Sequence, residues 1–134
     1  MEIRDYTEYN EAEIARLYGA VGWTAYTSDL PALREGFANS LLTLAAYDGD
    51  RLLGVLRAVG DGKTIVYIQD LLVYPSEQRR GVGTALLREA LRRYSSVRQI
   101  ALTTDRTPQT LAFYRSLGFA DYDSLGCCGF LYLK

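Results

Sequence analysis

The spacing of apolar residues changes along the chain, and each pattern predicts a different kind of element. In the N-terminal part, apolar positions recur every three or four residues, as on one face of a helix. Asn10 is placed to cap a helix over residues 11–20. Ser28 or Asp29 would precede a second helix, with Pro31 in its first turn. We therefore expect two helices before the first long strand.

From residue 42 the pattern becomes that of a sheet. Three runs rich in β-branched and aromatic residues, over 42–47, 51–59 and 64–73, are separated by glycine-containing turns, which predicts an antiparallel meander. The last run is apolar on both sides except for Gln69 and Asp70. Such a strand is typically covered on both faces, so we expect it at the centre of the sheet.

Shorter segments complete the predicted fold. The element order β-α-α-β-β-β-α-β-α-β-β indicates an α+β protein, with a mixed, mostly antiparallel sheet of about six to seven strands flanked by four helices. Since no linker or repeat divides the chain, we expect a single domain over residues 1–134. The remaining predicted elements are strands over 3–6, 99–103, 119–122 and 129–133, and helices over 82–94 and 107–118.

Charge and composition narrow the class of partner. The net charge of −1 argues against a general nucleic-acid binder. The chain begins without a basic segment followed by an apolar core, and no apolar run is long enough for a membrane span, so we expect no membrane partner. Cys127 and Cys128 are adjacent, too close for a relaxed disulfide, and are predicted as half-buried strand residues. Without histidine a metal site is not expected, and the cytoplasm is the predicted location.

A glycine-rich loop carries the clearest chemical signal. Residues 78–84, with the sequence QRRGVGT, follow a predicted strand and open a predicted helix. The free N–H groups at the start of a helix form an anion site, and glycines let a ligand approach the backbone. Arg79 and Arg80 add positive charge. A diphosphate fits this loop on physical grounds alone.

Two common diphosphate-binding loops do not match. The P-loop requires a lysine after its last glycine, whereas Thr84 follows Gly83. The dinucleotide fingerprint requires a small residue where Leu86 stands, and it prefers a parallel unit near the start of a chain. Both interpretations are therefore excluded.

The loop and a second segment together resemble the GNAT superfamily of N-acetyltransferases. The second segment, residues 111–119 with the sequence LAFYRSLGF, is similar to the family's C-terminal helix end. Two signatures in the right order, each in its expected strand or helix context, make the resemblance specific. The first signature consists of Leu71, Val73, Pro75, Gln78, Gly81 and Gly83.

The resemblance implies a GNAT-like fold with acetyl-CoA as co-substrate, bound where the motif-bearing strand splays from the next. An N–H near Leu72 would hydrogen-bond the thioester oxygen and stabilise the charge that develops on it. Thr107 stands where many members carry an asparagine that helps to hold the pantetheine arm. The implied cofactor-binding residues are Leu71, Leu72, Val73, Gln78, Arg79, Arg80, Gly81, Val82, Gly83, Thr84 and Thr107.

Two residues are candidates for proton transfer. Tyr114 resembles the family's general acid, which protonates the departing thiolate, although it would also suit a core aromatic position. The acceptor amine must lose a proton before it attacks, and without histidine the candidate bases are Asp70, Glu77 or a tyrosine. Asp70 is the preferred choice, because it is the lone acid of an apolar strand. A structural ion pair with Arg57 is an equally good interpretation of Asp70.

The acceptor site is expected opposite the cofactor, against the loop over residues 21–27. Aromatic faces in this loop could hold a cation, or they could simply cover the core. The predicted substrate-binding residues are Trp23, Tyr26, Arg57, Tyr67 and Gln69.

Three functions follow, in order of preference. The first is transfer of an acetyl group from acetyl-CoA to a primary amine of a small molecule or peptide. The second is a non-catalytic CoA-binding or sensing module on the same fold. The third is an interaction protein, which the 11 tyrosines would suit. A homodimer is a further expectation, because the apolar segment 130–133 could pair across two chains.

Overall fold

The computed structural model describes residues 1–134, which divide into two compact units, residues 1–103 and 104–134. The single domain stays a prediction. The first unit is built on one sheet of five strands in the order β1-β2-β3-β4-β5, in which only β4 and β5 are parallel. The mixed, mostly antiparallel α+β class is thus confirmed, although the number of strands is smaller than the predicted six to seven. The strands are β1 (Glu2–Asp5), β2 (Leu42–Asp48), β3 (Arg51–Gly60), β4 (Ile65–Val73) and β5 (Gln99–Leu102).

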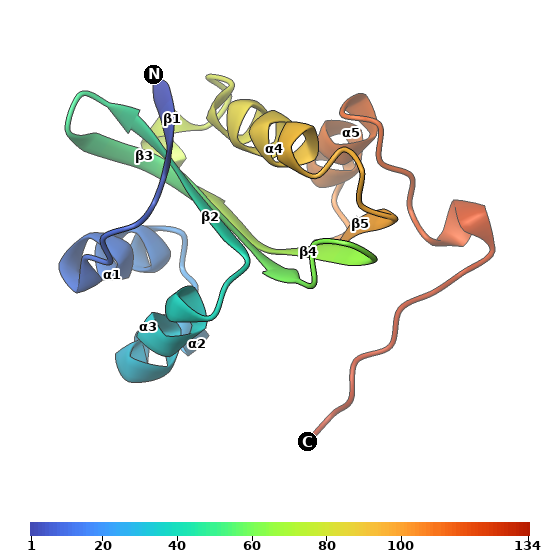
Figure 1. The fold of residues 1–134 in the computed structure, drawn as a ribbon, viewed down its shortest axis with the longest axis horizontal. Coiled ribbons are helices and arrows are strands. Elements are labelled where there is room, and N and C mark those ends of the chain that lie inside the picture. Colours follow the sequence, from blue (N-terminus) through green and yellow to red (C-terminus); the bar gives the residue numbers. More distant parts are fainter. The chain divides into compact units, whose positions relative to one another are not determined.

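Helices cover both faces of this sheet (Figure 1). The Asn10 side chain accepts a hydrogen bond from the Glu13 N–H at 3.0 Å, and the Asp29 side chain accepts one from the Ala32 N–H at 3.2 Å, so both predicted caps are confirmed. The predicted loop over residues 21–27 contains one additional helical turn. The helices of this unit are α1 (Glu11–Ala20), α2 (Thr24–Thr27), α3 (Leu30–Ala38) and α4 (Val82–Arg93), with a 3-10 turn η1 (Pro75–Glu77) before α4.

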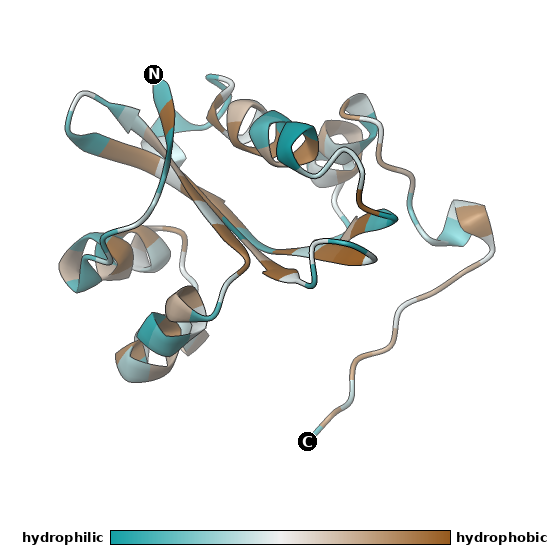
Figure 2. Cartoon of the chain, in the orientation of Figure 1, coloured by the Kyte–Doolittle hydropathy of each residue, from teal (hydrophilic) through white to brown (hydrophobic).

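The hydrophobic residues follow the two-faced burial that the sequence indicates. Figure 2 shows them concentrated along the central strands. On one face, side chains from α1 and α3 such as Ile14 and Phe37 pack against Val55 and Leu72 of the sheet. On the other face, α4 packs on β2, β3 and β4 and buries residues such as Leu86. β4 is therefore held from both sides, as predicted for the motif-bearing strand.

A β-bulge interrupts the pairing of β3 with β4. Arg57 pairs with Asp70, but the next residue, Ala58, pairs with Ile68, so Gln69 is an extra residue on β4. A bulge breaks the strict alternation of side chains and re-aims the residues beside it. Consistent with this, the neighbouring side chains of Gln69 and Asp70 both contact the hydroxyl of Tyr26.

The second unit differs most from the prediction. It contains α5 (Pro108–Ser116) and a 3-10 turn η2 (Asp123–Leu125), but the expected strands over 119–122 and 129–133 are absent. The cysteines are free and exposed rather than half-buried in a strand. The apolar side chains from Phe130 to Leu133 are 81–96% exposed. Strand propensity alone does not form a strand, because the ladder also needs a partner. The homodimer through this segment stays a prediction.

Candidate functional site

The loop before α4 presents its backbone N–H groups without protein partners. Arg79 and Gly81 both adopt left-handed conformations, with φ of 65° and 82°. The N–H groups from Arg79 to Thr84 make no hydrogen bond to the chain, and no side chain caps the helix. The loop itself is exposed from Gln78 to Gly81. These donors are therefore available to a ligand, and the binding of an anion by this loop stays a prediction.

The charged groups near this loop are partly paired. Glu77 is buried and accepts hydrogen bonds from the Arg51 guanidinium at 3.1 and 3.4 Å, and Arg80 lies 3.6 Å from it. The hydrogen bonds from Arg51, above all, lower the pKa of Glu77. Glu77, one of the candidate bases, is therefore paired with two arginines, whereas Arg79 forms no ion pair.

One edge of β4 is open beside this loop. β5 pairs with β4 only from Ile65 to Ile68, so no strand pairs with the rest of β4 on that side. The Tyr74 N–H donates to the Leu53 carbonyl on β3, at 3.0 Å. Because backbone groups alternate in direction along an antiparallel strand, Leu72 also faces β3, while Leu71 and Val73 face the open edge.

This alternation changes one detail of the expected site. The thioester donor was predicted near Leu72, but the register turns the backbone of Leu72 toward β3, so that the neighbouring Leu71 N–H is the one at the open edge. The Val73 carbonyl, at the same edge, accepts a hydrogen bond from the Gln78 side chain at 3.2 Å. The glycine loop and the open edge are therefore connected by a direct contact.

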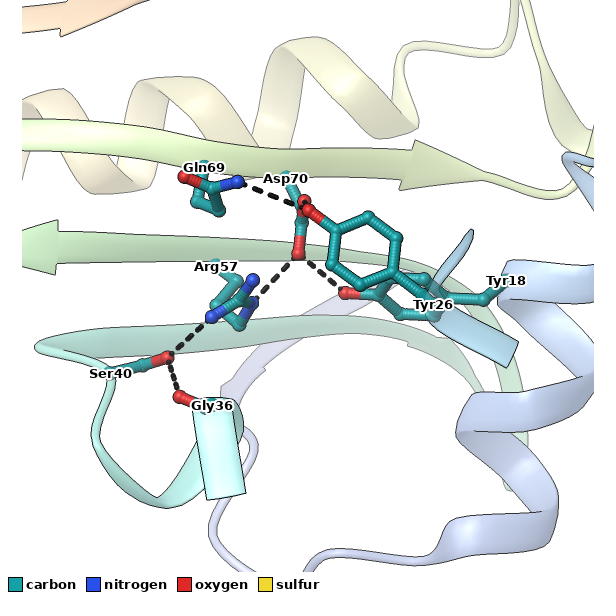
Figure 3. A network of polar contacts seen from close by, with 7 residues as sticks. All are labelled: Tyr18, Tyr26, Gly36, Ser40, Arg57, Gln69 and Asp70. Carbon is teal, nitrogen blue, oxygen red and sulfur yellow. Dashed lines mark hydrogen bonds and ion pairs between the residues drawn. The ribbon is translucent and has the colours of Figure 1, made fainter. Parts of the chain in front are cut away.

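Asp70 lies at the centre of a buried polar network, shown in Figure 3. Its side chain is fully buried and accepts three hydrogen bonds: from Arg57 Nε at 2.7 Å, from the Tyr18 hydroxyl at 2.8 Å and from the Tyr26 hydroxyl at 3.0 Å. Arg57 continues the network by donating to Ser40 Oγ at 3.3 Å. The ion pair with Arg57, one of the two interpretations of Asp70, is present.

The outer members of this network come from α2 and the bulge. The Tyr26 hydroxyl donates to Asp70 and accepts from Gln69 Nε2 at 3.1 Å, and its ring stacks on Trp23 with 5.9 Å between centroids. Burial, as the largest cause, raises the pKa of Tyr26 above its ordinary value. Gln69 is exposed, and Trp23 is 36% exposed. These three side chains form the accessible end of the network.

The structure therefore brings together four of the five predicted substrate-binding residues. Tyr67, the fifth, forms a separate hydrogen bond between its hydroxyl and Thr103 Oγ1 at 2.8 Å. The contact of Tyr18 with Asp70 was not predicted from the sequence. A signal was available, because a tyrosine on the buried stripe of a helix needs a partner for its hydroxyl.

In the second unit, Thr107 and Tyr114 occupy well-defined local positions. Thr107 Oγ1 accepts from the Thr110 N–H at 3.2 Å, and the Thr107 N–H donates back to Thr110 Oγ1 at 3.3 Å, a reciprocal cap at the start of α5. The Tyr114 ring lies edge-on to Phe113 and Phe119. Burial raises the pKa of Tyr114. Both side chains thus have structural roles, and their contacts with cofactor stay predictions.

Comparison with known proteins identifies the family. The profile of the Acetyltransferase (GNAT) family matches residues 5–119, so the chain belongs to this family. Enzymes of the family use acetyl-CoA as co-substrate. The expected resemblance, transferase class and co-substrate are therefore confirmed at the level of the family.

Similar sequences and structures agree with this assignment. An acetyltransferase of the GNAT family from Streptococcus pneumoniae is 36% identical, with a TM-score of 0.91 over 99% of this chain and 97% of that one. An N-acetyltransferase from Thermoplasma acidophilum, solved in complex with coenzyme A, has a TM-score of 0.76 over 89% of each chain; at 16% identity it supports the fold alone.

Among curated sequences, the uncharacterized N-acetyltransferase ycf52 of Gracilaria tenuistipitata var. liui is 29% identical over 82% of this chain. The chain spans 62% of the length of that relative. A chloroplastic GCN5-related N-acetyltransferase of Arabidopsis thaliana is 28% identical over 93% of this chain. None of the helices combines the length and apolar character that crossing a bilayer requires. The cytoplasmic location stays a prediction.

Proposed function

We propose that this protein transfers an acetyl group from acetyl-CoA to a primary amine of a small molecule or peptide. The observation that carries the proposal is the row of unpaired N–H groups from Arg79 to Thr84, at a helix N-terminus beside the open edge of β4. A helix N-terminus with free amides favours a diphosphate. The strand edge offers main-chain groups of Leu71 and Val73 to the amides of a pantetheine arm.

The chemistry follows from where these groups lie. The Leu71 N–H, at the open edge, would donate to the thioester oxygen and stabilise negative charge as the amine attacks the carbonyl carbon. The carbon–nitrogen bond forms and the carbon–sulfur bond breaks. The nitrogen gives up one proton to water, and the departing sulfur takes up a proton from a donor that water then reprotonates. Tyr114 is the proposed donor of that proton. Its raised pKa keeps the phenol protonated across the neutral range, so that a proton is available.

Asp70 cannot take a proton from the acceptor by direct contact. Its side chain is fully buried and already accepts three hydrogen bonds. Any proton that reached it from the acceptor side would have to pass through the hydroxyl of Tyr26. The acceptor itself is proposed to bind at the accessible end of the network, against Trp23, Tyr26 and Gln69.

Two measurements on the full chain test the proposal. Millimolar acetyl-CoA should raise the melting temperature, because a ligand that binds only the folded state stabilises it. A panel of amines, polyamines, amino acids, aminoglycosides and peptides should then include at least one that releases thiol with saturable kinetics. The absence of a melting shift would contradict the proposal. A shift without thiol release for any acceptor would favour the non-catalytic CoA-binding module instead.

The variant Tyr114→Phe separates catalysis from binding. Loss of a positioned general acid typically lowers the rate by about 10²–10⁴-fold. We expect kcat to fall by this order while the melting shift with acetyl-CoA is unchanged. An unchanged kcat would remove Tyr114 from the proposed mechanism and leave it as a packing residue of α5.

A further inference from the structure

Two groups fix the direction of every hydrogen bond around Asp70. An arginine side chain has only donors, and an ionised carboxylate has only acceptors. Arg57 Nε lies 2.7 Å from Asp70 Oδ2, so Asp70 is held as a carboxylate. Tyr18 and Tyr26 must therefore donate their hydroxyl protons to it. A phenol has a single proton, so the Tyr26 oxygen has none left for any other partner.

The direction of the Tyr26 hydrogen bond to Asp70 also determines the direction of the hydrogen bond between Tyr26 and Gln69. The side-chain amide of Gln69 lies 3.1 Å from the Tyr26 oxygen, and because Tyr26 cannot donate again, Gln69 must donate through Nε2. Its carbonyl oxygen, Oε1, is left as a free acceptor of an exposed side chain, next to the second N–H of Nε2. The accessible end of the network therefore offers two acceptors, the remaining lone pair of Tyr26 and the Gln69 carbonyl, beside one remaining N–H of Gln69.

We propose that these two outward-facing oxygens select the acceptor by its N–H groups. The buried Arg57–Asp70 pair is the cause of this selection, because it fixes the direction of the hydrogen bonds that leave both oxygens as acceptors. The inference rests on the proposed function and specifies the group that the acceptor site recognises: a primary ammonium or amine. The opposite charges of Arg57 and Asp70 compensate each other at the ion pair. Recognition therefore depends on hydrogen-bond donors of the ligand rather than on its charge. In this arrangement Asp70 is a positioning residue, while Tyr26 and Gln69 contact the acceptor.

A different recognition mode would use the same residues. The stacked rings of Trp23 and Tyr26 could attract a cation through their faces, and such attraction does not require N–H groups. Aromatic faces bind quaternary ammonium ions well. The two modes therefore make opposite predictions for a pair of ions that carry the same charge and differ only in their N–H groups.

The ions n-butylammonium and n-butyltrimethylammonium provide this test. Trp23 is the only tryptophan of the chain, so its fluorescence reports on this site without a label. Each ion is titrated into the full protein, alone and with saturating CoA, which lacks the acetyl group and prevents turnover. We expect the primary ion to bind at least about tenfold more tightly, the effect of a charge-assisted hydrogen bond. Equal binding, tighter binding of the quaternary ion, or no binding of either would overturn the proposal.

Two accessible variants locate the selectivity. Tyr26→Phe and Gln69→Leu each remove one of the outward acceptors, and each should lower the ratio of the two dissociation constants. Tyr47→Phe is the matched control, because its hydroxyl contacts Glu13 at 3.3 Å and not Asp70. It should keep the wild-type ratio. A wild-type ratio in both Tyr26→Phe and Gln69→Leu would contradict the proposed contacts.

Asp70→Asn tests the positioning role. An asparagine amide can donate to Tyr26, which frees the phenol to turn its proton outward, so the ratio should fall while CoA still raises the melting temperature. If Asp70 acted only as a base, the ratio would not change, because no proton is transferred in the CoA complex. Should Asp70→Asn not fold, the two accessible variants decide the proposal. If CoA did not bind while the ratio of the two dissociation constants kept its expected value, the result would contradict the proposed function rather than the hydrogen-bond selection.

Discussion

The two ends of β4 differ in whether the chain supplies an acceptor for the backbone N–H groups there. Before the strand, the N–H groups of Lys63, Thr64 and Ile65 all donate to one carboxylate oxygen of Asp61, at 2.7–3.1 Å. After the strand, the N–H groups from Arg79 to Thr84, at the start of α4, have no partner in the chain. Both sites are exposed clusters of donors suited to an anion. At the first site the anion is the side chain of Asp61, whereas at the second site a ligand must supply it.

The largest effect is expected between these two ends, where Asp70 is a third carboxylate satisfied by the protein. Removing one partner of a buried ion pair leaves an uncompensated charge, at a cost of about 3–5 kcal/mol. Asp70→Ala should therefore lower the free energy of unfolding in urea by this amount, since Arg57 would remain buried without its partner. Replacing both residues, in Arg57→Met with Asp70→Leu, should recover much of the loss. A double variant as unstable as Asp70→Ala would show that the cost comes from packing rather than charge.

The next prediction supplies the second end of β4 with an anion of its own. Gly81 is the N-cap of α4, and aspartate and asparagine are both favoured at such positions and tolerate left-handed backbone. Gly81→Asp should place a carboxylate among the free amides, which would satisfy them and repel a diphosphate. We expect affinity for acetyl-CoA to fall about a hundredfold, or about 2.7 kcal/mol, by calorimetry. Gly81→Asn, of the same size but neutral, is the control and should lose much less. Equal losses would exclude charge as the cause.

A smaller effect is expected from backbone conformation alone. Gly81 and Gly49 both have left-handed φ, 82° and 61°, and a Cβ at either position would meet no atom within 4 Å. Alanine in this conformation costs about 1–2 kcal/mol at each position. Gly81→Ala should also weaken acetyl-CoA binding about tenfold, as the loop relaxes away from the conformation that aims its amides. Gly49→Ala, in the β2–β3 turn, should be equally destabilised and bind acetyl-CoA normally. Normal binding by both variants would contradict the ligand role of the loop.

The sequence predicted the loop after β4 more fully than the Asp70 network within the strand. Glycines around a helix start gave the ligand-binding loop, because backbone geometry and free amides are local properties. The Asp70 network was harder, since its members Tyr18 and Tyr26 are separated from it by 52 and 44 residues. Only Arg57, on the adjacent strand, could be paired with Asp70 by counting residues along the two predicted strands. The bulge at Gln69, which turns that residue toward Tyr26, has no signal in a single sequence.

The segment after α5 shows the opposite failure. Its apolar run from Phe130 to Leu133 favoured a strand, yet the chain provides no pairing there. A strand depends on a partner that is distant in sequence, whereas a helix such as α5 satisfies its own backbone after a Thr107 cap. Local rules therefore succeeded for caps and helices, and failed for the two strands expected after α5, which have no second segment to pair with.

The smallest predicted effect concerns the first end of β4 and appears only as a dependence on pH. Hydrogen bonds from the Thr64 hydroxyl, above all, and from the surrounding backbone N–H groups hold the pKa of Asp61 well below its ordinary value. A carboxylate whose pKa is lower in the folded state stabilises the fold above its unfolded pKa of about 3.9, and this contribution is lost as pH falls toward the folded value.

Asp61→Asn keeps an acceptor oxygen and removes the charge, so wild type should melt slightly higher than the variant at pH 7. The difference in Tm should remain until about pH 4 and then shrink toward pH 2, because the wild-type carboxylate is progressively protonated in the unfolded chain and then in the folded one. Other acids such as Glu77 titrate in both proteins and cancel in the difference. Circular dichroism melts across this range measure it. A difference that stays constant with pH would mean that the turn needs only an acceptor, and that the anion at the start of β4 is dispensable.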